Sequence, residues 1–219
     1  MPTEPEEFLD ESPGEPRVHG FLHRAENSES GLVLTHGAGS NCNSPLLIAL
    51  ATSLSAAGLT VLRCDLPFRQ MRPHGPPLGS AEKDQAGIRR AAQVLRGSVS
   101  GRIFLGGHSY GGRMASMLAA QESAIAAGLL LLSYPLHPPR KPQQLRTAHF
   151  PNLRTPALFV HGTRDPFGSA EEVQSALALI PAETKLVAVE GAGHELLSKT
   201  NRERLLETVL TEFKMFSKL

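Results

Sequence analysis

Ser109 is the residue of this chain whose surroundings most clearly indicate chemistry. It lies at the centre of Gly-His-Ser-Tyr-Gly, residues 107–111, between a short apolar run at 103–105 and a helical pattern at 112–121. In a sharp turn between a strand and a helix the serine backbone is strained, and glycines two residues to either side avoid a clash. Such a turn places the hydroxyl at a helix N-terminus, where free N–H groups favour negative charge. The pattern predicts a nucleophilic serine, with a plain helix-capping serine as the alternative.

A serine hydroxyl is a weak nucleophile unless a histidine takes its proton and a carboxylate orients that histidine. Asp165 and His194 each follow a short apolar run that indicates a strand. Because the carboxyl ends of parallel strands share one edge of a sheet, we expect Ser109, Asp165 and His194 to converge there as a catalytic triad. Three alternatives stay open: Asp165 as a plain Asp-Pro turn residue, Glu190 as the competing acid, and His194 as a solvated loop histidine.

The segment His-Gly-Ala-Gly at residues 36–39 follows the first of the apolar runs. Its glycines allow the backbone to approach a substrate oxygen closely. The N–H groups of Ala38 and Tyr110 would then form an oxyanion hole, each stabilising the transition state by about 3 kcal/mol. We expect His36 and His108 to brace these loops by hydrogen bonds.

Six short apolar runs precede or follow these loops and are expected to position them. The runs alternate with helical patterns over the C-terminal four-fifths of the chain. The runs span residues 32–35, 60–64, 103–105, 129–132, 157–160 and 185–189. They are mostly apolar on both faces, which is typical of buried parallel strands. The chain is therefore expected to be an α/β protein, with a mostly parallel central sheet flanked by helices.

Helix starts are indicated by capping residues ahead of amphipathic stretches. The predicted start signals are Ser44 followed by Pro45, Ser169 with Glu172, and Thr200 with Glu203. Gly58 is expected to end the first of these helices.

We expect one domain over residues 1–219, with no linker and no internal repeat. Residues 1–30 differ in character, because residues 1–16 carry six acids and no base. Segments 7–10 and 17–23 flank a Ser-Pro-Gly turn and predict an antiparallel hairpin at the sheet edge.

Two long, proline-rich connections, 66–79 and 134–155, are expected to build the substrate pocket. The expected substrate-binding residues are Gly37, Phe68, Tyr134 and Leu136. Arg113 lies one helical turn after Ser109, and we expect it to pair with an acid, with recognition of a substrate carboxylate as the alternative. No insertion of ~40 residues follows the run at 129–132, so we expect no lid or cap domain.

The composition excludes several classes of protein. The 219 residues carry 22 basic and 21 acidic side chains, for a net charge of +1. No apolar run approaches the ~20 residues that a membrane span needs, and the bases are scattered instead of clustering with aromatics. No cysteine, histidine or acid spacing is typical of a metal site. We expect a cytoplasmic protein, because the acidic start differs from a signal peptide, with a small-molecule substrate and no metal, cofactor, nucleic acid or membrane partner. The oligomeric state is open.

Four motifs occur in one order, at residues 36–39, 107–111, 161–165 and 191–194. Together they resemble the α/β-hydrolase superfamily over about residues 17–219. The chain looks most like the small, lidless dienelactone-hydrolase-like group, which includes the hydrolase-like domain of a chromatin-acetyltransferase-complex subunit. Residues 131–138 and Arg113 carry that likeness. Dienelactone hydrolases proper use a cysteine nucleophile where this chain has Ser109, so the resemblance does not extend to their substrate.

The motifs and the resemblance together predict a serine hydrolase that cleaves small carboxylic esters or thioesters through an acyl-enzyme. Some relatives in the chromatin-subunit group lack parts of the triad, whereas this chain has a serine, an aspartate and a histidine at the matching positions. Two alternatives remain. One is a non-catalytic interaction domain with a hydrolase fold, and the other is hydrolysis of peptide, lactone or carbon–carbon bonds on the same scaffold.

Overall fold

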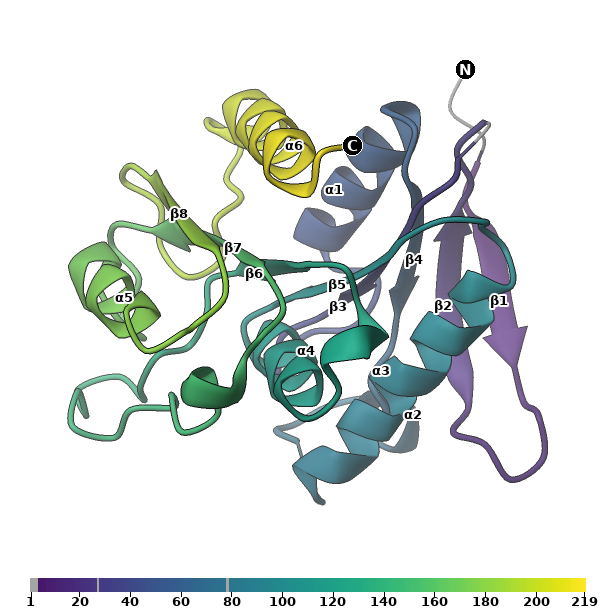
Figure 1. Ribbon diagram of the computed structural model, residues 1–219, viewed down its shortest axis with the longest axis horizontal. Coiled ribbons are helices and arrows are strands. Elements are labelled where there is room, and N and C mark those ends of the chain that lie inside the picture. The colour runs from purple at the N-terminus through teal and green to yellow at the C-terminus, as the bar shows by residue number, and fades with distance from the viewer. Residues whose placement is uncertain (1–3, 27, 78) are drawn as a thin grey trace.

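An eight-stranded sheet forms the centre of the computed structural model, which describes residues 4–26, 28–77 and 79–219 (Figure 1). The strands are β1 (Glu6–Asp10), β2 (Val18–His23), β3 (Gly31–Thr35), β4 (Thr60–Cys64), β5 (Ile103–His108), β6 (Leu129–Leu132), β7 (Ala157–Gly162) and β8 (Thr184–Val189). The helices are α1 (Pro45–Ala56), α2 (Pro67–Met71), α3 (Ala81–Arg96), α4 (Tyr110–Gln121), α5 (Ala170–Leu177) and α6 (Arg202–Ser217), with short 3-10 turns at Ser123–Ile125 and Phe150–Asn152.

The strand order is β1-β2-β4-β3-β5-β6-β7-β8, and the six strands from β3 to β8 are mutually parallel. They correspond to the six apolar runs of the sequence, so the predicted α/β class and mostly parallel sheet are confirmed. The chain runs from β3 outward to β4, and the connection from β4 then crosses back over β3 to β5, so the direction of winding reverses between β3 and β5. Loops that follow the parallel strands therefore meet at one edge.

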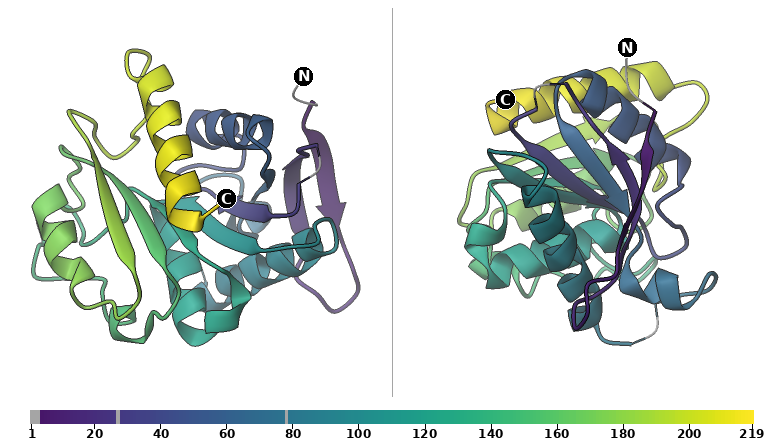
Figure 2. Two further views of the ribbon diagram at one scale, coloured as in Figure 1. Left: turned by 45° about the horizontal axis from the view of Figure 1, so that its top comes forward. Right: turned by 90° about the vertical axis from the view of Figure 1, so that its right-hand side faces the viewer.

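The predicted N-terminal hairpin is present, since β1 pairs antiparallel with β2 and β2 pairs antiparallel with β4 (Figure 2). Its outer strand is tied to α3 by Arg90, whose Nε donates to Asp10 Oδ2 at 2.8 Å and whose guanidinium also bonds Ser12. Residues 1–3 of the acidic start lie outside the described residues.

Helices cover both faces of the sheet, with α1 and α6 on one face and α3, α4 and α5 on the other (Figure 1). Successive side chains of a strand point to opposite faces, so each central strand contributes to both layers. Val33, Leu105, Leu131 and Phe159 pack under α3, α4 and α5. Leu32, Leu34, Phe104 and Leu130 pack under α1 and α6. Burial on both faces explains why these strands read as continuous apolar runs.

Two of the three predicted helix starts are confirmed. Ser44 accepts a hydrogen bond from Leu47 N–H ahead of Pro45, and Ser169 forms a capping box with Glu172. Gly58, which has φ of +96°, follows the end of α1 as expected.

The third predicted helix start, Thr200 with Glu203, is wrong. Helix α6 begins at Arg202, with Asn201 at its N-cap. Thr200 lies in the preceding turn, where its hydroxyl meets Ser198 Oγ at 3.1 Å and Asn201 bonds the Ser198 backbone. These local side-chain bonds delay the helix by one residue.

The sequence analysis did not predict α2, a five-residue helix inside the connection 66–79, which was expected to be a loop. Among the described residues no cap domain covers the sheet edge, and no helix there is both long and apolar enough to cross a membrane.

Both cysteines are buried free thiols, and this predicts their reactivity. Burial and then the Asp65 carboxylate raise the pKa of Cys42 to about 12, and burial raises the pKa of Cys64 well above its ordinary value. Because the thiolate is the reacting species, native protein at pH 8 is expected to react with Ellman's reagent at under one thiol per chain over several minutes. Two thiols per chain should react in guanidinium, and one in a Cys42→Ser variant. Rapid reaction of both thiols in native buffer would contradict this burial.

Candidate active site

The turn between β5 and α4 holds Ser109 in a backbone conformation that residues with a side chain rarely adopt, with φ of 51° and ψ of −114°. Such strain costs about 1–3 kcal/mol and persists only where the surroundings enforce it. Here the Ser109 N–H donates to Leu132 O at 2.8 Å, and Arg113 N–H donates to Ser109 O at 3.0 Å. Bonds to the end of β6 and to the first turn of α4 therefore hold the serine at the start of the helix.

The glycines that flank this turn are required by a neighbouring strand. A Cβ on Gly107 would come within 2.6 Å of Thr35 Oγ1, and a Cβ on Gly111 would come within 2.6 Å of His36 O. Real side chains essentially never show contacts this short. The prediction that both positions require glycine is therefore confirmed, and the reason is that the end of β3 packs directly against the turn.

His194 lies between Ser109 and Asp165 in a continuous chain of hydrogen bonds. Its Nε2 is 2.8 Å from Ser109 Oγ, and its Nδ1 is 2.8 Å from Asp165 Oδ2. The carboxylate accepts only, so Nδ1 carries the proton, and Nε2 is free to accept from the serine hydroxyl. Glu190, the alternative acid, is exposed and makes no contact with His194 among the described residues. The structure brings the three predicted residues together.

Asp165 is buried and stays ionised for identifiable reasons. Burial alone would raise its pKa, but the hydrogen bond and charge of His194, the Phe167 N–H and nearby His161 hold the pKa below its usual value. The Phe167 N–H donates to Oδ1 at 2.9 Å. His161 donates instead to Gly168 O at 2.8 Å, which fixes the loop around the carboxylate.

Two rings fix the orientation of His194. Phe167 lies against its imidazole, with ring centroids 4.2 Å apart and planes tilted by 33°. His108 donates from Nε2 to the His194 carbonyl at 2.8 Å, and burial lowers the pKa of His108 so that it acts as a neutral donor. His108 therefore has the bracing role expected from the sequence.

The expected oxyanion loop is shaped by His36. Its Nε2 accepts from Leu66 N–H at 3.1 Å, so the ring proton is on Nδ1, which donates to Gly37 O at 2.8 Å. The Gly37 carbonyl also accepts from Ser40 N–H at 3.1 Å. Since the peptide is planar and trans, anchoring this carbonyl turns the Ala38 N–H the opposite way. Gly37 itself lies against Ser109, and a Cβ there would meet Ser109 Cβ at 3.5 Å.

Neither Ala38 N–H nor Tyr110 N–H donates to any of the residues that the structure describes. Tyr110 is the first residue of α4, so its N–H is one of the free donors at that helix N-terminus. Both residues line the same cleft as Ser109.

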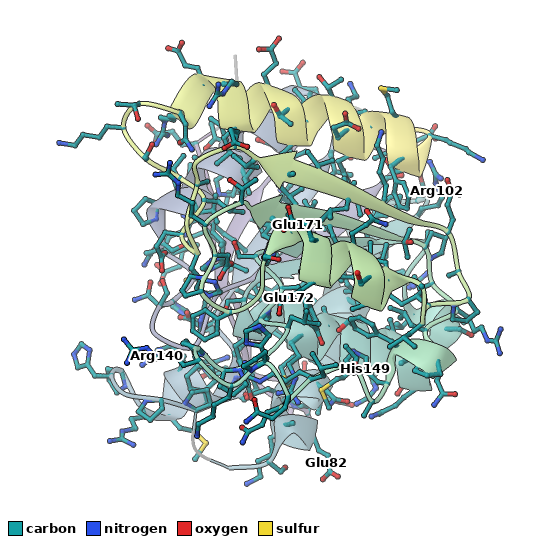
Figure 3. The ribbon with its side chains drawn as sticks, turned by 90° about the vertical axis from the view of Figure 1, so that its left-hand side faces the viewer. Glu82, Arg102, Arg140, His149, Glu171 and Glu172 are labelled. Atoms are coloured by element: carbon teal, nitrogen blue, oxygen red, sulfur yellow. The ribbon has the colours of Figure 1, made fainter. Side chains whose placement is uncertain are left out.

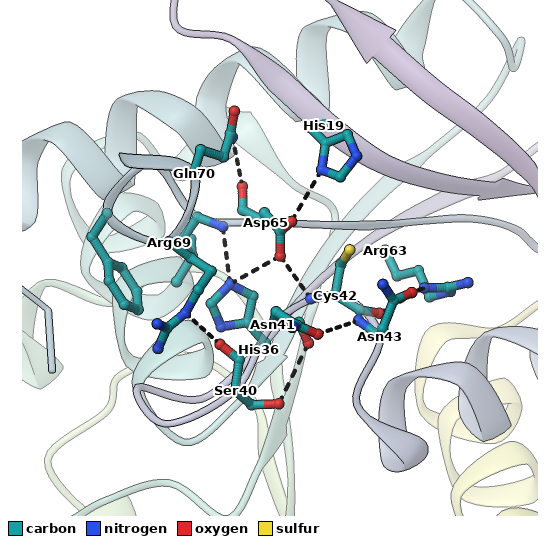
Figure 4. A network of polar contacts seen from close by, with 12 residues as sticks. His19, His36, Ser40, Asn41, Cys42, Asn43, Arg63, Asp65, Arg69 and Gln70 are labelled. Carbon is teal, nitrogen blue, oxygen red and sulfur yellow. Dashed lines mark hydrogen bonds and ion pairs between the residues drawn. The ribbon is translucent and has the colours of Figure 1, made fainter. Parts of the chain in front are cut away.

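A polar network on the far side of this loop positions it (Figure 4). Asp65 Oδ1 accepts from Cys42 N–H at 2.7 Å, and Oδ2 bonds His19 Nδ1 at 3.0 Å. Arg69 donates to Ala38 O at 2.6 Å and to Ser40 O at 2.7 Å. Arg69 thus satisfies backbone carbonyls of the loop and Asp65 satisfies a backbone N–H, which limits the movement of the loop.

His19, Cys42 and Asp65 also place potential metal-ligand atoms within 4.8 Å of one another. Both carboxylate oxygens of Asp65 already bond within this network. The raised pKa of Cys42 disfavours the thiolate that a metal would require. The arrangement fits a structural hydrogen-bond network, and we assign no metal to it.

Ser109 opens into a cleft of about 620 Å³ at the carboxyl edge of the sheet. Its wall includes the predicted residues Gly37, Ala38, Tyr110 and His194, together with Phe167 and Arg146.

The other predicted substrate-binding residues, Phe68, Tyr134 and Leu136, are buried in the core and do not line this cleft. Phe68 packs between the rings of His36 and Tyr110. The reason for the difference is that α2 and the β6–β7 connection turn these three side chains inward.

Arg113 also differs from its expected structural role. It lines the cleft, and none of the described acids lies within ion-pair distance of its guanidinium. Sequence reasoning had no signal for Arg146 in the cleft wall or for Arg69 beneath the oxyanion loop, since both act through contacts between distant segments.

Comparison with known proteins agrees with this fold. Residues 28–217 match the family model of an alpha/beta hydrolase domain. A dienelactone hydrolase from Anabaena variabilis is similar, at 20% identity and a TM-score of 0.77, over 98% of this chain and 99% of that one. An α/β serine hydrolase without a lid from Xanthomonas campestris is similar at 16% identity and a TM-score of 0.69, over 98% and 96% of the two chains. A serine hydrolase homologue from Coxiella burnetii is 19% identical, with a TM-score of 0.76 over 94% and 96%.

Two buried histidines, His23 and His36, and the half-buried His149 predict how stability depends on pH. Burial is the largest cause that lowers the pKa of His23, His36 and His149 to about 4 each. The unfolded chain protonates these histidines near pH 6.5, so at pH 5 these three rings together bind about three more protons in the unfolded chain than in the folded one. Stability is therefore complete above pH ~6.5 and is lost as the pH falls toward 4, by about 4 kcal/mol per pH unit near pH 5.

Urea unfolding at pH 7, 6 and 5 measures this slope. A His149→Gln variant should reduce it by about one proton, whereas a His74→Gln variant in an exposed loop should leave it unchanged. A free energy of unfolding that stays constant from pH 7 to 5 would show that these rings are protonated in the folded protein.

Proposed function

Because the chain belongs to the alpha/beta hydrolase family, we propose that it is a serine hydrolase that cleaves small carboxylic esters or thioesters through an acyl-enzyme. The observation that carries this proposal is the continuous hydrogen-bond chain from Asp165 through His194 to Ser109, with both links at 2.8 Å. The reaction uses side chains of this protein and water.

In the first half-reaction His194 Nε2 takes the hydroxyl proton as Ser109 Oγ attacks the substrate carbonyl carbon. The carbonyl oxygen becomes negative, and the N–H groups of Ala38 and Tyr110 stabilise it. The ionised Asp165 stabilises the imidazolium that forms at His194 and keeps its ring oriented. The tetrahedral intermediate then collapses, and His194 returns the proton to the departing alcohol or thiol.

In the second half-reaction a water molecule enters the cleft and gives its proton to His194 Nε2 while its oxygen attacks the acyl carbon. The same N–H donors stabilise the second oxyanion. Collapse breaks the bond to Ser109 Oγ, which regains its proton from His194, and the carboxylic acid leaves.

The shape of the cleft supports small substrates. At about 620 Å³ it is within the range for small-molecule sites, and the structure describes no cap domain above it. Hydrolysis of lactones, peptides or carbon–carbon bonds would use the same groups, so a substrate panel is needed to rank these reactions.

Replacing Ser109 by Ala should lower kcat on a small ester such as p-nitrophenyl acetate by a factor of ~10³ or more, with KM little changed. The variant should also lose labelling by a fluorescent fluorophosphonate. Asp165→Asn should lower kcat by about 10⁴ because Nδ1 loses the acceptor that fixes its proton.

Ser98→Ala, at an exposed position away from the cleft, is the matched control and should keep wild-type rate and labelling. Circular dichroism and thermal unfolding establish that each variant folds. A folded Ser109→Ala protein that retains its esterase rate, or a folded wild type that reacts with none of the probes, would exclude this mechanism.

A further inference from the structure

Two arginines share the cleft with Ser109. Arg113 lies four residues after the serine on α4, so it occupies the same face of that helix one turn further on. Arg146 comes from the connection between β6 and β7 and lines the same cleft. The cleft thus places two permanent positive charges beside the nucleophile.

Neither guanidinium has a carboxylate partner among the residues that the structure describes. Arg17, Arg89 and Arg90 each form an ion pair with an acid, with N–O distances of 3.0 Å or less. By contrast, the Nε of Arg113 is buried and makes no hydrogen bond. Arg146 reaches one carbonyl, Pro135 O, at 3.4 Å. A buried donor without an acceptor is costly, so the Nε of Arg113 is expected to have an acceptor that the described residues do not supply.

The two arginines also act on each other and on their surroundings. Burial and then the charge of Arg113 lower the pKa of Arg146. Burial and then the charge of Arg113 lower the pKa of His149, which is labelled in Figure 3, to about 4, so this ring stays neutral. The acid on the cleft wall, Glu195, is exposed and pairs with neither arginine among the described residues. A bound anion would relieve the repulsion between the two guanidinium groups.

The backbone around both arginines is anchored by buried groups. Tyr134, which is buried, donates its hydroxyl to Arg146 O at 2.6 Å, and Arg146 N–H donates to Leu136 O at 2.8 Å. Ser116 Oγ lies 2.9 Å from both Arg113 O and His149 Nε2. Tyr134 and Leu136, which the sequence placed in the pocket wall, thus support a residue that lines it. The planar guanidinium fork matches a carboxylate or phosphate, and an anchored backbone limits how far each arginine can move from the cleft.

We propose that Arg113 and Arg146 form an anion subsite, and that the substrate is an ester or thioester that carries a carboxylate or phosphate group besides its reacting carbonyl. This inference rests on the proposed function of Ser109 for the reaction, but the subsite itself binds an anion whether or not the serine reacts. The two arginines then determine specificity, while the triad performs the bond cleavage.

Matched substrates test the proposal on the purified full-length chain. p-Nitrophenyl hydrogen adipate is compared with p-nitrophenyl hexanoate for a charge on the acyl side. 4-Acetoxybenzoate and 4-acetoxyphenyl phosphate are compared with 4-acetoxybenzamide for a charge on the leaving group. In at least one pair the wild type should prefer the anionic member in kcat/KM, and Arg113→Met and Arg146→Met should each reduce that preference roughly 10- to 100-fold.

Conservative and distant variants separate charge recognition from folding. Arg113→Lys and Arg146→Lys should restore part of the preference, because they keep the charge without the planar fork. Arg140→Met is the matched control, since Arg140 is exposed on the same connection and does not line the cleft (Figure 3). Equal loss of rate on the charged and the neutral member of every pair would show a structural role and overturn the subsite.

A separate binding measurement makes this test independent of catalysis. Isothermal titration of the Ser109→Ala protein with adipate, benzoate and inorganic phosphate should detect at least one anion, and binding should be lost in Ser109→Ala chains that also carry Arg113→Met or Arg146→Met. Which anion binds distinguishes carboxylate from phosphate recognition. If the anions bind but no ester is cleaved, the subsite stands and the proposed reaction fails. If esters are cleaved without charge preference and no anion binds, the reaction stands and the subsite is wrong.

Discussion

The close contact between the end of β3 and the turn after β5 is the constraint on which the site depends. Thr35 and His36 leave no room for side chains at residues 107 and 111, which flank Ser109 with its φ of 51°. One packing arrangement therefore sets three features together. It exposes the serine hydroxyl to the cleft, frees the Tyr110 N–H at the start of α4, and brings the oxyanion loop against the serine.

The loops of this site are held by polar side chains that are themselves buried. His36 anchors the Gly37 carbonyl, Arg69 binds the Ala38 carbonyl, and His161 fixes the loop that carries Asp165. Loops usually move more than strands and helices, but side chains buried beneath them can remove that freedom. Catalysis by preorganised donors requires such rigidity, because donors that must reorient during the reaction lose much of their effect.

Among the described residues, charged groups are paired beneath the loops of the site, but the arginines in the cleft have no acidic partner. Around Asp165 and His36 every charge and polar proton has a partner nearby, which is typical of a structural framework. In the cleft, Arg113 and Arg146 lack acidic partners in the described part of the chain. Unbalanced charge beside a nucleophile is more often retained for a ligand than for stability, because it costs folding free energy.

The α/β class, the six parallel strands and the convergence of Ser109, Asp165 and His194 could all be predicted from the sequence. They could be predicted because apolar strand runs and loop motifs are local residue patterns. Local patterns failed at Thr200, where a turn competed with the helix, and at Phe68, Tyr134 and Leu136, whose side chains turned out to face the core. The side chains that line the cleft could not be predicted in this way, because they are brought together by tertiary contacts. Arg146 and Arg113 come from segments over thirty residues apart, and no local signal reports that two such side chains share one cavity or that neither meets an acid.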